Sequence, residues 1–204
     1  MRMYLGQLAP VFFFGSLMVV TGCTAFETSN SGPMVHTQEQ DWASGYIAPF
    51  VPTPHEVVER MLELAEVSAS DVVYDLGSGD GRIVIAAARK YGAKAVGIEI
   101  DPALVTHSRR NIKEAGLEHL AEIREEDIRN ADLSPATVVT MYLYPRANFR
   151  LRPAIRRQLK PGSRVVALDF GMGDWQPDRV ERMTDSSGFL RTIYIWRIGE
   201  GSRR

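Results

Sequence analysis

The sequence predicts an α/β fold, a doubly wound and mostly parallel seven-stranded sheet that ends in an antiparallel hairpin. Three observations predict it. From residue 57 onward, short runs rich in β-branched residues alternate with segments of helical periodicity, as in strands joined by crossover helices. A glycine-rich turn follows the first of these runs. Near the C-terminus, two apolar runs flank the turn residues 185–188, which indicates a hairpin.

The helices are predicted from apolar residues that recur three and four positions apart. In the first helix, Val57, Met61 and Leu64 share one face, and Pro54 precedes its start. Gly116 follows the third helix, and Pro161 stops the fourth. The predicted helices are residues 57–67, 82–91, 102–115 and 148–159.

The strands are predicted from short apolar runs bounded by turn residues. The first of them leads directly into the glycine-rich turn, and the fourth is the richest in β-branched side chains. The last two make the terminal hairpin. The predicted strands are residues 71–75, 95–100, 119–124, 137–143, 164–170, 180–184 and 190–198.

Length and composition limit the organisation of the chain. Its 204 residues suit one domain, and 45% hydrophobic with 24% charged residues is a globular composition. The net charge of −1 gives no basic excess, which disfavours nucleic acid as a partner. The single cysteine excludes disulfides within the chain and Cys-based zinc sites, and the four histidines are scattered. We therefore expect no metal ion. Separately, we expect the protein to be a monomer.

Residues 1–23 are predicted to be a signal peptide with a lipobox. Arg2 precedes an apolar run at residues 8–20, and small residues follow it. The run VTGC at residues 20–23 resembles the bacterial lipobox, in which Cys23 would carry the lipid. Two alternatives stay open. Residues 4–26 are nearly long enough for an uncleaved signal anchor, and the start codon could be misassigned.

Charge on the two sides of this segment predicts where the rest of the chain lies. No Lys or Arg occurs between Cys23 and Arg60, whereas Arg2 lies on the amino-terminal side. The positive-inside rule then places the body outward, as a membrane-anchored lipoprotein. A misassigned start or an inverted anchor would leave the body cytoplasmic. Residues 24–45 are predicted to be a flexible tether, residues 46–199 the folded domain and residues 200–204 a tail.

The glycine-rich turn is the strongest indication of function. Gly77, Gly79 and Gly81 alternate directly after the first strand, and Glu99 lies at the end of the next strand. Glycine lets the backbone approach a ligand closely, and the first N–H groups of the following helix point toward it. A carboxylate at Glu99 can accept both hydroxyls of a ribose. The turn predicts a nucleoside-containing ligand, although a tight turn without a ligand has the same local pattern.

The charge of this turn separates two classes of cofactor. A dinucleotide fingerprint has the spacing G-x-G-x-x-G and holds an anionic pyrophosphate. Here the spacing is G-x-G-x-G, and Asp75 and Asp80 would repel a pyrophosphate. S-adenosylmethionine (SAM) has no phosphate and carries a sulfonium and an ammonium group. The turn therefore favours SAM and disfavours an NAD-dependent oxidoreductase.

These residues also resemble a known family. The run DLGSGDGR at residues 75–82 resembles motif I of class I (seven-strand) SAM-dependent methyltransferases, which have a Rossmann-like fold. Within that class, four further runs are similar to the Dot1-like and mitochondrial protein-lysine methyltransferase group: PTP at 52–54, GIEID at 97–101, YLYP at 142–145 and PGSRVV at 161–166. The resemblance covers residues 46–198. It implies SAM-dependent methyl transfer to a lysine amine of a protein substrate.

The same resemblance implies a role for each cofactor-binding residue. Glu99 would hold the ribose, and Ile128 would lie against the adenine ring. Asp127 would meet the adenine amino group, although it could equally be one solvated acid among several. Thr53 would lie near the methionine carboxylate. The cradle for the methionine part would be made by Asp75, Gly77, Gly79 and Gly81.

The acceptor pocket is expected beyond the carboxyl ends of the fourth and fifth strands. Tyr142 would line a lysine channel, Asp169 would orient the amine and Trp175 would form an aromatic wall. Core packing for Tyr142 and Trp175, and a strand-end cap for Asp169, are the structural alternatives. Amide and adenine N-methyltransferases carry Asn/Asp-Pro-Pro-Tyr/Phe after this strand. Residues 141–145 lack it, which disfavours those acceptors.

Three further hypotheses concern the surroundings of the site. Tyr46 and Phe50 are predicted to fold over the cofactor as a lid. Residues 146–164 contain seven Lys and Arg without an acid, as a solvated helix face or a docking surface would. Because SAM is made in the cytosol, an outward-facing body also allows a second function. It would be a non-catalytic envelope lipoprotein that binds a nucleoside-like ligand or a protein partner through the same fold.

Overall fold

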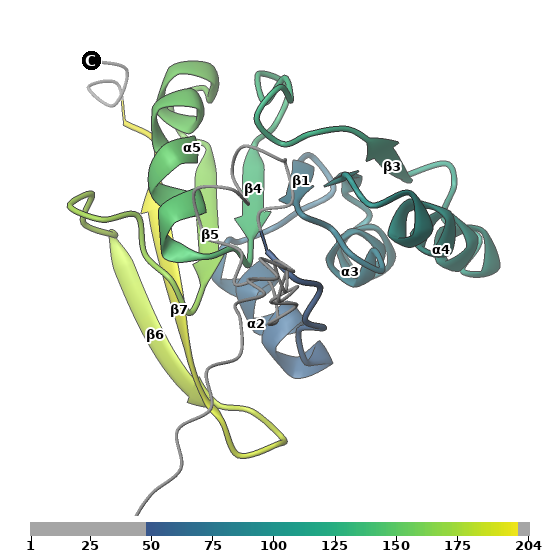
Figure 1. Cartoon of the computed structure of the whole chain (residues 1–204), viewed down its shortest axis with the longest axis horizontal. Helices are drawn as coiled ribbons and strands as arrows, with labels where there is room; N and C mark the ends of the chain where they lie inside the picture. Colours follow the sequence, from purple (N-terminus) through teal and green to yellow (C-terminus); the bar gives the residue numbers. More distant parts are fainter. Residues whose placement is uncertain (1–47, 200–204) are drawn as a thin grey trace, which may run out of the picture. The chain divides into compact units, whose positions relative to one another are not determined.

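A seven-stranded sheet with the order β3-β2-β1-β4-β5-β7-β6 runs through residues 48–199, the part of the chain that the computed structural model describes (Figure 1). The predicted signal peptide, Cys23, the whole of the predicted tether and the tail lie outside these residues. The strands are β1 (Val72–Leu76), β2 (Lys94–Glu99), β3 (Ala121–Glu125), β4 (Val138–Met141), β5 (Arg164–Leu168), β6 (Arg179–Thr184) and β7 (Leu190–Arg197).

The pairing of the strands confirms the predicted fold class. β1 pairs in parallel with β2 and β4, and the parallel ladder continues outward to β3 and β5. β7 is antiparallel to both β5 and β6. The hairpin of β6 and β7 therefore adds an antiparallel edge to a parallel sheet, as the sequence predicts.

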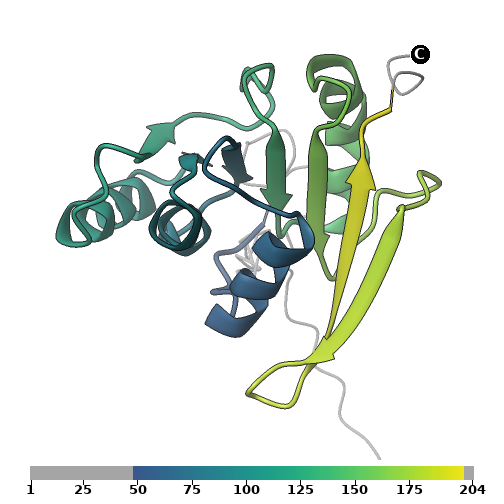
Figure 2. The same ribbon diagram turned by 180° about the vertical axis from the view of Figure 1, so that it is seen from behind.

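Helices cover both faces of this sheet. α2 (His55–Leu64), α3 (Arg82–Tyr91) and α4 (Pro102–Glu114) pack on one face. α5 (Pro145–Gln158) packs on the other face (Figures 1 and 2). Successive residues of a strand point to opposite faces, so each central strand contributes to both apolar layers. In β1, Val73 belongs to the layer under α2 and α3, whereas Tyr74 belongs to the layer under α5.

Several elements end or begin at residues that the sequence pattern does not mark. β4 and β5 end at Met141 and Leu168, two residues earlier than predicted, so Tyr142 and Asp169 lie just beyond the sheet. α5 begins at Pro145, three residues earlier than predicted, because a proline suits the first turn of a helix. α2 ends at Leu64, and Glu66 then adopts a left-handed conformation with φ +53°.

Within residues 48–199, none of the helices combines the length and the apolar character that crossing a bilayer requires. The same described part of the chain contains no cluster of three or more His, Cys, Asp or Glu residues arranged to hold a metal ion.

Candidate active site

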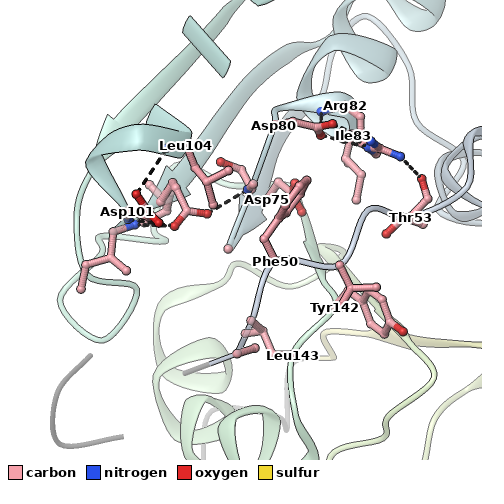
Figure 3. Close-up of a pocket in the computed structure, with 18 of the residues that line it drawn as sticks. Phe50, Thr53, Asp75, Asp80, Arg82, Ile83, Asp101, Leu104, Tyr142 and Leu143 are labelled. Carbon is pink, nitrogen blue, oxygen red and sulfur yellow. Dashed lines mark hydrogen bonds and ion pairs between the residues drawn. The ribbon is translucent and has the colours of Figure 1, made fainter. Parts of the chain in front are cut away.

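A cavity lies at the carboxyl ends of β1, β2 and β4 (Figure 3). β1 is the strand from which the sheet order runs in opposite directions, and open α/β sheets bind ligands beside such a strand. The glycine turn, the end of β2 and the segment before α2 all contribute to the wall. The lining residues are Ala48, Pro49, Phe50, Val51, Thr53, Asp75, Gly77, Ser78, Gly79, Asp80, Arg82, Ile83, Ile98, Glu99, Ile100, Asp101, Leu104, Ile128, Tyr142 and Leu143.

Glu99 connects the glycine turn to the start of α4. Its Oε2 accepts a hydrogen bond from the backbone N–H of Gly79 at 2.8 Å. Its Oε1 accepts from the N–H groups of Ile100 and Asp101 at 2.9 and 3.0 Å. With 7% of its surface exposed, Glu99 is a nearly buried carboxylate in the wall of the cavity. It lies where the sequence motifs predict the ribose.

Asp75 is the second buried carboxylate of the cavity. Its side chain accepts a hydrogen bond from the Thr140 hydroxyl at 2.7 Å, and only 3% of the residue is exposed. Burial raises the pKa of Asp75 to about 7. The Thr140 hydrogen bond opposes this rise, whereas the negative charges of Glu99 and Asp80 add to it. Asp75 is therefore poised to lose its proton when a cation enters the cavity.

Arg82 neutralises the third carboxylate, Asp80, which the sequence alone presents as a free charge. Its guanidinium pairs with Asp80 at 2.5 Å and also donates to the carbonyl oxygen of Thr53 at 2.6 Å. Burial acts against ionisation of Asp80, but the hydrogen bonds from Arg82 lower the pKa of this carboxyl. Arg82 thereby ties the segment before α2 to the glycine turn (Figure 3). Thr53 is 5% exposed and lines the cavity.

Gly81 and Asp127 lie just outside the lining, beside residues that belong to it. Gly81 is the N-cap residue of α3, and a Cβ added there would be 3.2 Å from Cβ of Ser108. The Asp127 carboxylate pairs with Arg129 and also accepts from the Arg129 backbone N–H at 2.9 Å. Its neighbour Ile128 lines the cavity. The roles in cofactor binding of Gly81 and Asp127 stay predictions.

Tyr142, which the sequence predicts to lie beside the acceptor, lines the cavity. Its hydroxyl oxygen accepts a hydrogen bond from Nη1 of Arg191 at 3.2 Å. The same nitrogen donates to Oδ2 of Asp169 at 2.9 Å. Burial raises the pKa of Tyr142, the Asp169 carboxylate raises it further, and Arg191 opposes both. Asp169 lies behind Tyr142, outside the lining itself.

Trp175 packs against the apolar layer on the α5 side of the sheet and does not line the cavity. Its ring packs against Trp196 with the centroids 5.7 Å apart, and the Arg156 guanidinium lies over it. Its carbonyl oxygen accepts from Nε1 of Trp196 at 3.0 Å. These contacts are those of a packing residue. A catalytic role for Trp175 stays a prediction without a place in the cavity.

Two residues of the site, Arg82 and Arg191, are not predicted from the sequence. Arg82 directly follows the last glycine of the turn, so its position in the run was a usable signal. Arg191 gives no such signal, because only the register of β7 against β5 brings it beside Tyr142.

The charge of the lining fits SAM. Asp75, Asp80, Glu99 and Asp101 contribute four carboxylates, and Arg82 contributes the single guanidinium. A sulfonium and an ammonium group against one carboxylate suit such a wall better than a pyrophosphate does. The Ser78 hydroxyl is buried in this lining and has no hydrogen-bond partner in the described part of the chain. A bound ligand with polar groups could provide one.

Comparisons with known proteins agree with this geometry. A sequence model of the ANTKMT methyltransferase domain matches residues 75–179. A protein-lysine N-methyltransferase of Saccharolobus islandicus (strain REY15A) is 44% identical over 153 residues, which are 74% of this chain and 94% of that protein. The chain belongs to the ANTKMT methyltransferase family.

Two other proteins extend the comparison. The adenine nucleotide translocase lysine N-methyltransferase of Mus musculus is 33% identical over 129 residues, 63% of this chain but only 56% of that protein. An RNA methyltransferase from Salinibacter ruber, crystallised with S-adenosyl-L-homocysteine, is 58% identical, with a TM-score of 0.69 and coverage of 74% of this chain and 95% of that one. S-adenosyl-L-homocysteine is SAM without its methyl group.

Membership of the ANTKMT family confirms the resemblance that the sequence motifs carry. It also confirms SAM as the cofactor, and with it methyl transfer as the reaction type. In this family member, Asp75 and Glu99 would hold the cofactor from the ends of β1 and β2. SAM supplies the electrophilic methyl group when it is bound.

Proposed function

We propose that this chain transfers methyl groups from SAM to the amine of lysine side chains in a protein substrate. The observation that carries the proposal is an acidic cavity whose far end is formed by a partly buried tyrosine, Tyr142, backed by the Asp169 carboxylate. The relatives named as lysine N-methyltransferases support the choice of acceptor.

For methyl transfer, the protein must align the amine nitrogen with the methyl group of SAM, and the amine must be uncharged. A lysine amine has an ordinary pKa of about 10.4, and its nitrogen attacks only after it has lost a proton. Insertion into a partly buried site near a positive charge lowers the pKa of that amine. Tyr142, whose own pKa is raised, stays protonated and offers its oxygen to the amine. Alignment for in-line attack then supplies most of the rate gain.

The deciding experiment is radiolabelling of a cell lysate. The purified protein is incubated with the lysate and with SAM that carries a tritiated methyl group. Separate portions of the labelled product are then treated with protease, with ribonuclease or with acid. Label that disappears with protease, survives ribonuclease and elutes with methyllysine after acid hydrolysis supports the proposal. Label that disappears with ribonuclease would instead assign an RNA substrate, the class for which the Salinibacter ruber protein is named.

A matched variant makes this labelling specific to the site. Glu99→Ala removes the carboxylate that holds the glycine turn, so it should abolish labelling with the reagents otherwise unchanged. If SAM binds the wild-type protein in calorimetry but no macromolecule becomes labelled, the non-catalytic binder is the better account.

We also propose, from the sequence alone, that Cys23 is lipidated and that the body lies on the outer side of the membrane. The lipobox-like run at residues 20–23 and the absence of Lys and Arg from residues 24 to 59 support it. Metabolic labelling with palmitate should mark the wild-type protein and spare Cys23→Ser. A C-terminal phosphatase reporter, active only outside the cytosol, tests the side of the membrane independently.

A further inference from the structure

The guanidinium of Arg191 joins three separate parts of the fold. Arg191 is the second residue of β7 and pairs with Met183 of β6 in the hairpin. Its Nη1 donates to Tyr142 beyond β4 and to Asp169 beyond β5, at 3.2 and 2.9 Å. Its Nε donates to Oδ2 of Asp185 in the hairpin turn at 2.7 Å. One cation thus connects the ends of two parallel strands to the antiparallel hairpin.

We infer that Arg191 is a positioning residue for the acceptor amine, acting through Tyr142 and Asp169. The inference rests on the proposed function, because it assigns how the acceptor end of that same cavity is held. Nothing in the motif-bearing runs of the sequence includes this arginine.

Burial gives these contacts their strength. The side chains of Arg191, Asp169 and Asp185 are 17%, 18% and 0% exposed. Charge-assisted hydrogen bonds between groups so far removed from water are shorter and stronger than neutral ones. The two aspartates give the cluster one more negative than positive charge. A cationic acceptor would therefore be attracted to the cluster before it loses its proton.

Counting the hydrogen bonds of Tyr142 shows what Arg191 does to it. A tyrosine hydroxyl has one hydrogen and two lone pairs. Arg191 can only donate, so it uses one lone pair. The hydroxyl hydrogen is left for Asp169, whose hydrogen bond and charge both raise the pKa of Tyr142. One lone pair of the Tyr142 oxygen remains. It can accept a hydrogen bond from one N–H of an incoming amine, and this hydrogen bond would fix the orientation of the amine nitrogen.

The backbone at Asp169 supports a position held for function. Asp169 has φ +59°, a left-handed conformation that a residue other than glycine seldom adopts. Its Oδ1 accepts from the Thr192 backbone N–H at 2.9 Å, and its own N–H donates to the Thr192 carbonyl at 2.7 Å. Such strained residues persist where the surrounding structure fixes them, and they concentrate at functional sites.

The contact between Arg191 and Asp185 has a structural role in the hairpin turn. Besides Arg191, it accepts from the N–H groups of Ser187 and Phe189, both at 2.9 Å, and so closes the hairpin turn. The Nε of Arg191 therefore stabilises the hairpin through Asp185, and its Nη1 contacts Tyr142 and Asp169. An experiment has to distinguish a loss of hairpin stability from a loss of acceptor positioning.

A double-mutant cycle separates them. Arg191→Gln, Tyr142→Phe and the double variant are compared for the initial rate of protein labelling at saturating SAM and for SAM affinity in calorimetry. We expect each single variant to lose on the order of 10–100-fold in rate, with the double variant no slower than Tyr142→Phe, because Arg191 acts through that hydroxyl. SAM affinity should stay within about twofold. Arg191→Lys, which keeps a donor but loses the fork, should recover part of the rate.

Two controls complete the design. Arg182→Gln removes an exposed arginine from the same hairpin and should leave the rate unchanged. If Arg191→Gln unfolds, the same cycle is run with Asp169→Asn. Three outcomes would each overturn the inference while the proposed function stands. They are rate losses that multiply in the double variant, an unchanged rate in Arg191→Gln, and a loss of SAM affinity equal to the loss of rate. A wild-type protein that labels nothing would remove the proposed function and this inference together.

Discussion

The aromatic ring of Phe50 lies directly over the α-carbon of Gly79. A Cβ added to Gly79 would be only 2.4 Å from Cε2 and 2.6 Å from Cδ2 of that ring. Phe50 is 43% exposed, so its ring covers the glycine turn while part of it stays in contact with solvent. This contact, together with the hydrogen bond from Arg82 to Thr53, brings the segment before α2 onto the cavity. Phe50 is thus placed for the predicted lid, whereas Tyr46 lies outside the described residues.

Gly79→Ala should therefore carry two separate penalties. The left-handed φ of +53° costs a residue with a Cβ about 1–2 kcal/mol, and the collision with Phe50 adds to it. In Gly79→Ala/Phe50→Ala, the collision is gone and only the backbone penalty should remain. Denaturant unfolding of the two single variants and the double variant measures both, and SAM affinity should fall at least about tenfold in Gly79→Ala.

A matched glycine isolates the backbone penalty. Gly188 in the hairpin turn has φ +86°, and a Cβ there would meet nothing within 4 Å. Gly188→Ala should lower the free energy of unfolding only by the cost of the left-handed backbone, and it should leave SAM affinity unchanged. Strictly additive effects of the changes at residues 79 and 50 would contradict the contact.

The affinity for SAM should depend on pH through Asp75. Burial raises the pKa of this carboxyl to about 7, so below pH 7 it holds a proton that a cationic ligand must displace. Affinity should therefore strengthen as pH rises toward 7, by up to about tenfold per unit, and then become constant. The protein without ligand has the opposite trend, losing stability from about pH 4 to pH 7, because its folded state keeps a proton that the unfolded chain releases.

Calorimetry in buffers of different ionisation enthalpy measures this linkage directly. Binding should release close to one proton per SAM at pH 6 and almost none at pH 8. In Asp75→Asn, the pH dependence should be absent and the affinity weak throughout. An affinity that is the same at pH 6 and pH 8 in the wild-type protein would exclude this role of Asp75.

Thr140→Val should move the pH dependence upward. The Thr140 hydroxyl donates to Oδ1 of Asp75 at 2.7 Å, a hydrogen bond that lowers the pKa of the carboxyl. Valine has nearly the same shape and no hydroxyl, so the pKa of Asp75 should rise further. The midpoint of the SAM affinity profile should then rise by about one pH unit. Thr140→Ser keeps the hydroxyl and should retain the wild-type midpoint; a Val variant with that same midpoint would contradict the assignment.

The parts of the site that the sequence predicts are those with local causes. Asp75, the alternating glycines and Glu99 lie at strand ends or in one tight turn, so a short run of residues contains the whole geometry. Tyr142 could be placed at the cavity for the same reason, because it directly follows a recognisable strand. The side of the sheet on which Trp175 packs depends on a loop without periodicity, and the sequence did not determine it.

Long-range contacts account for what the sequence could not predict. Arg82 reaches Thr53 across 29 positions, and Arg191 reaches Tyr142 across 49. Both contacts depend on how segments align in space, which hydrophobic periodicity does not encode. The early ends of β4 and β5 have the same origin, because a parallel ladder stops where a partner strand stops: Met141 is paired with Leu76, the last residue of β1.

Arg164 illustrates how packing can change the interpretation of a basic run. It belongs to the basic residues 146–164, yet its guanidinium lies against the Asp71 carboxylate at 3.0 Å, with the two side chains 13% and 7% exposed. Asp71 also accepts from the Thr137 hydroxyl at 2.7 Å. Burial acts against ionisation, but the hydrogen bonds from Arg164, Thr137 and Ser68 lower the pKa of Asp71 to about 2. This pair joins the start of β1 to the start of β5.

Asp71→Asn should consequently destabilise the protein by about 2 kcal/mol at pH 7, screening near the surface included. The ordinary pKa of this carboxyl is 3.8, so its stabilising effect is complete above that value and is lost as the pH falls from about 4 to 2. The unfolding free energies of wild-type protein and variant should therefore converge in acid. Asp174→Asn, which breaks an ion pair with Arg152, should leave stability nearly unchanged, because the Asp174 side chain is 84% exposed. A constant difference between wild-type and Asp71→Asn from pH 7 to pH 2 would mean that the residue acts by its shape and hydrogen bonds alone, without its charge.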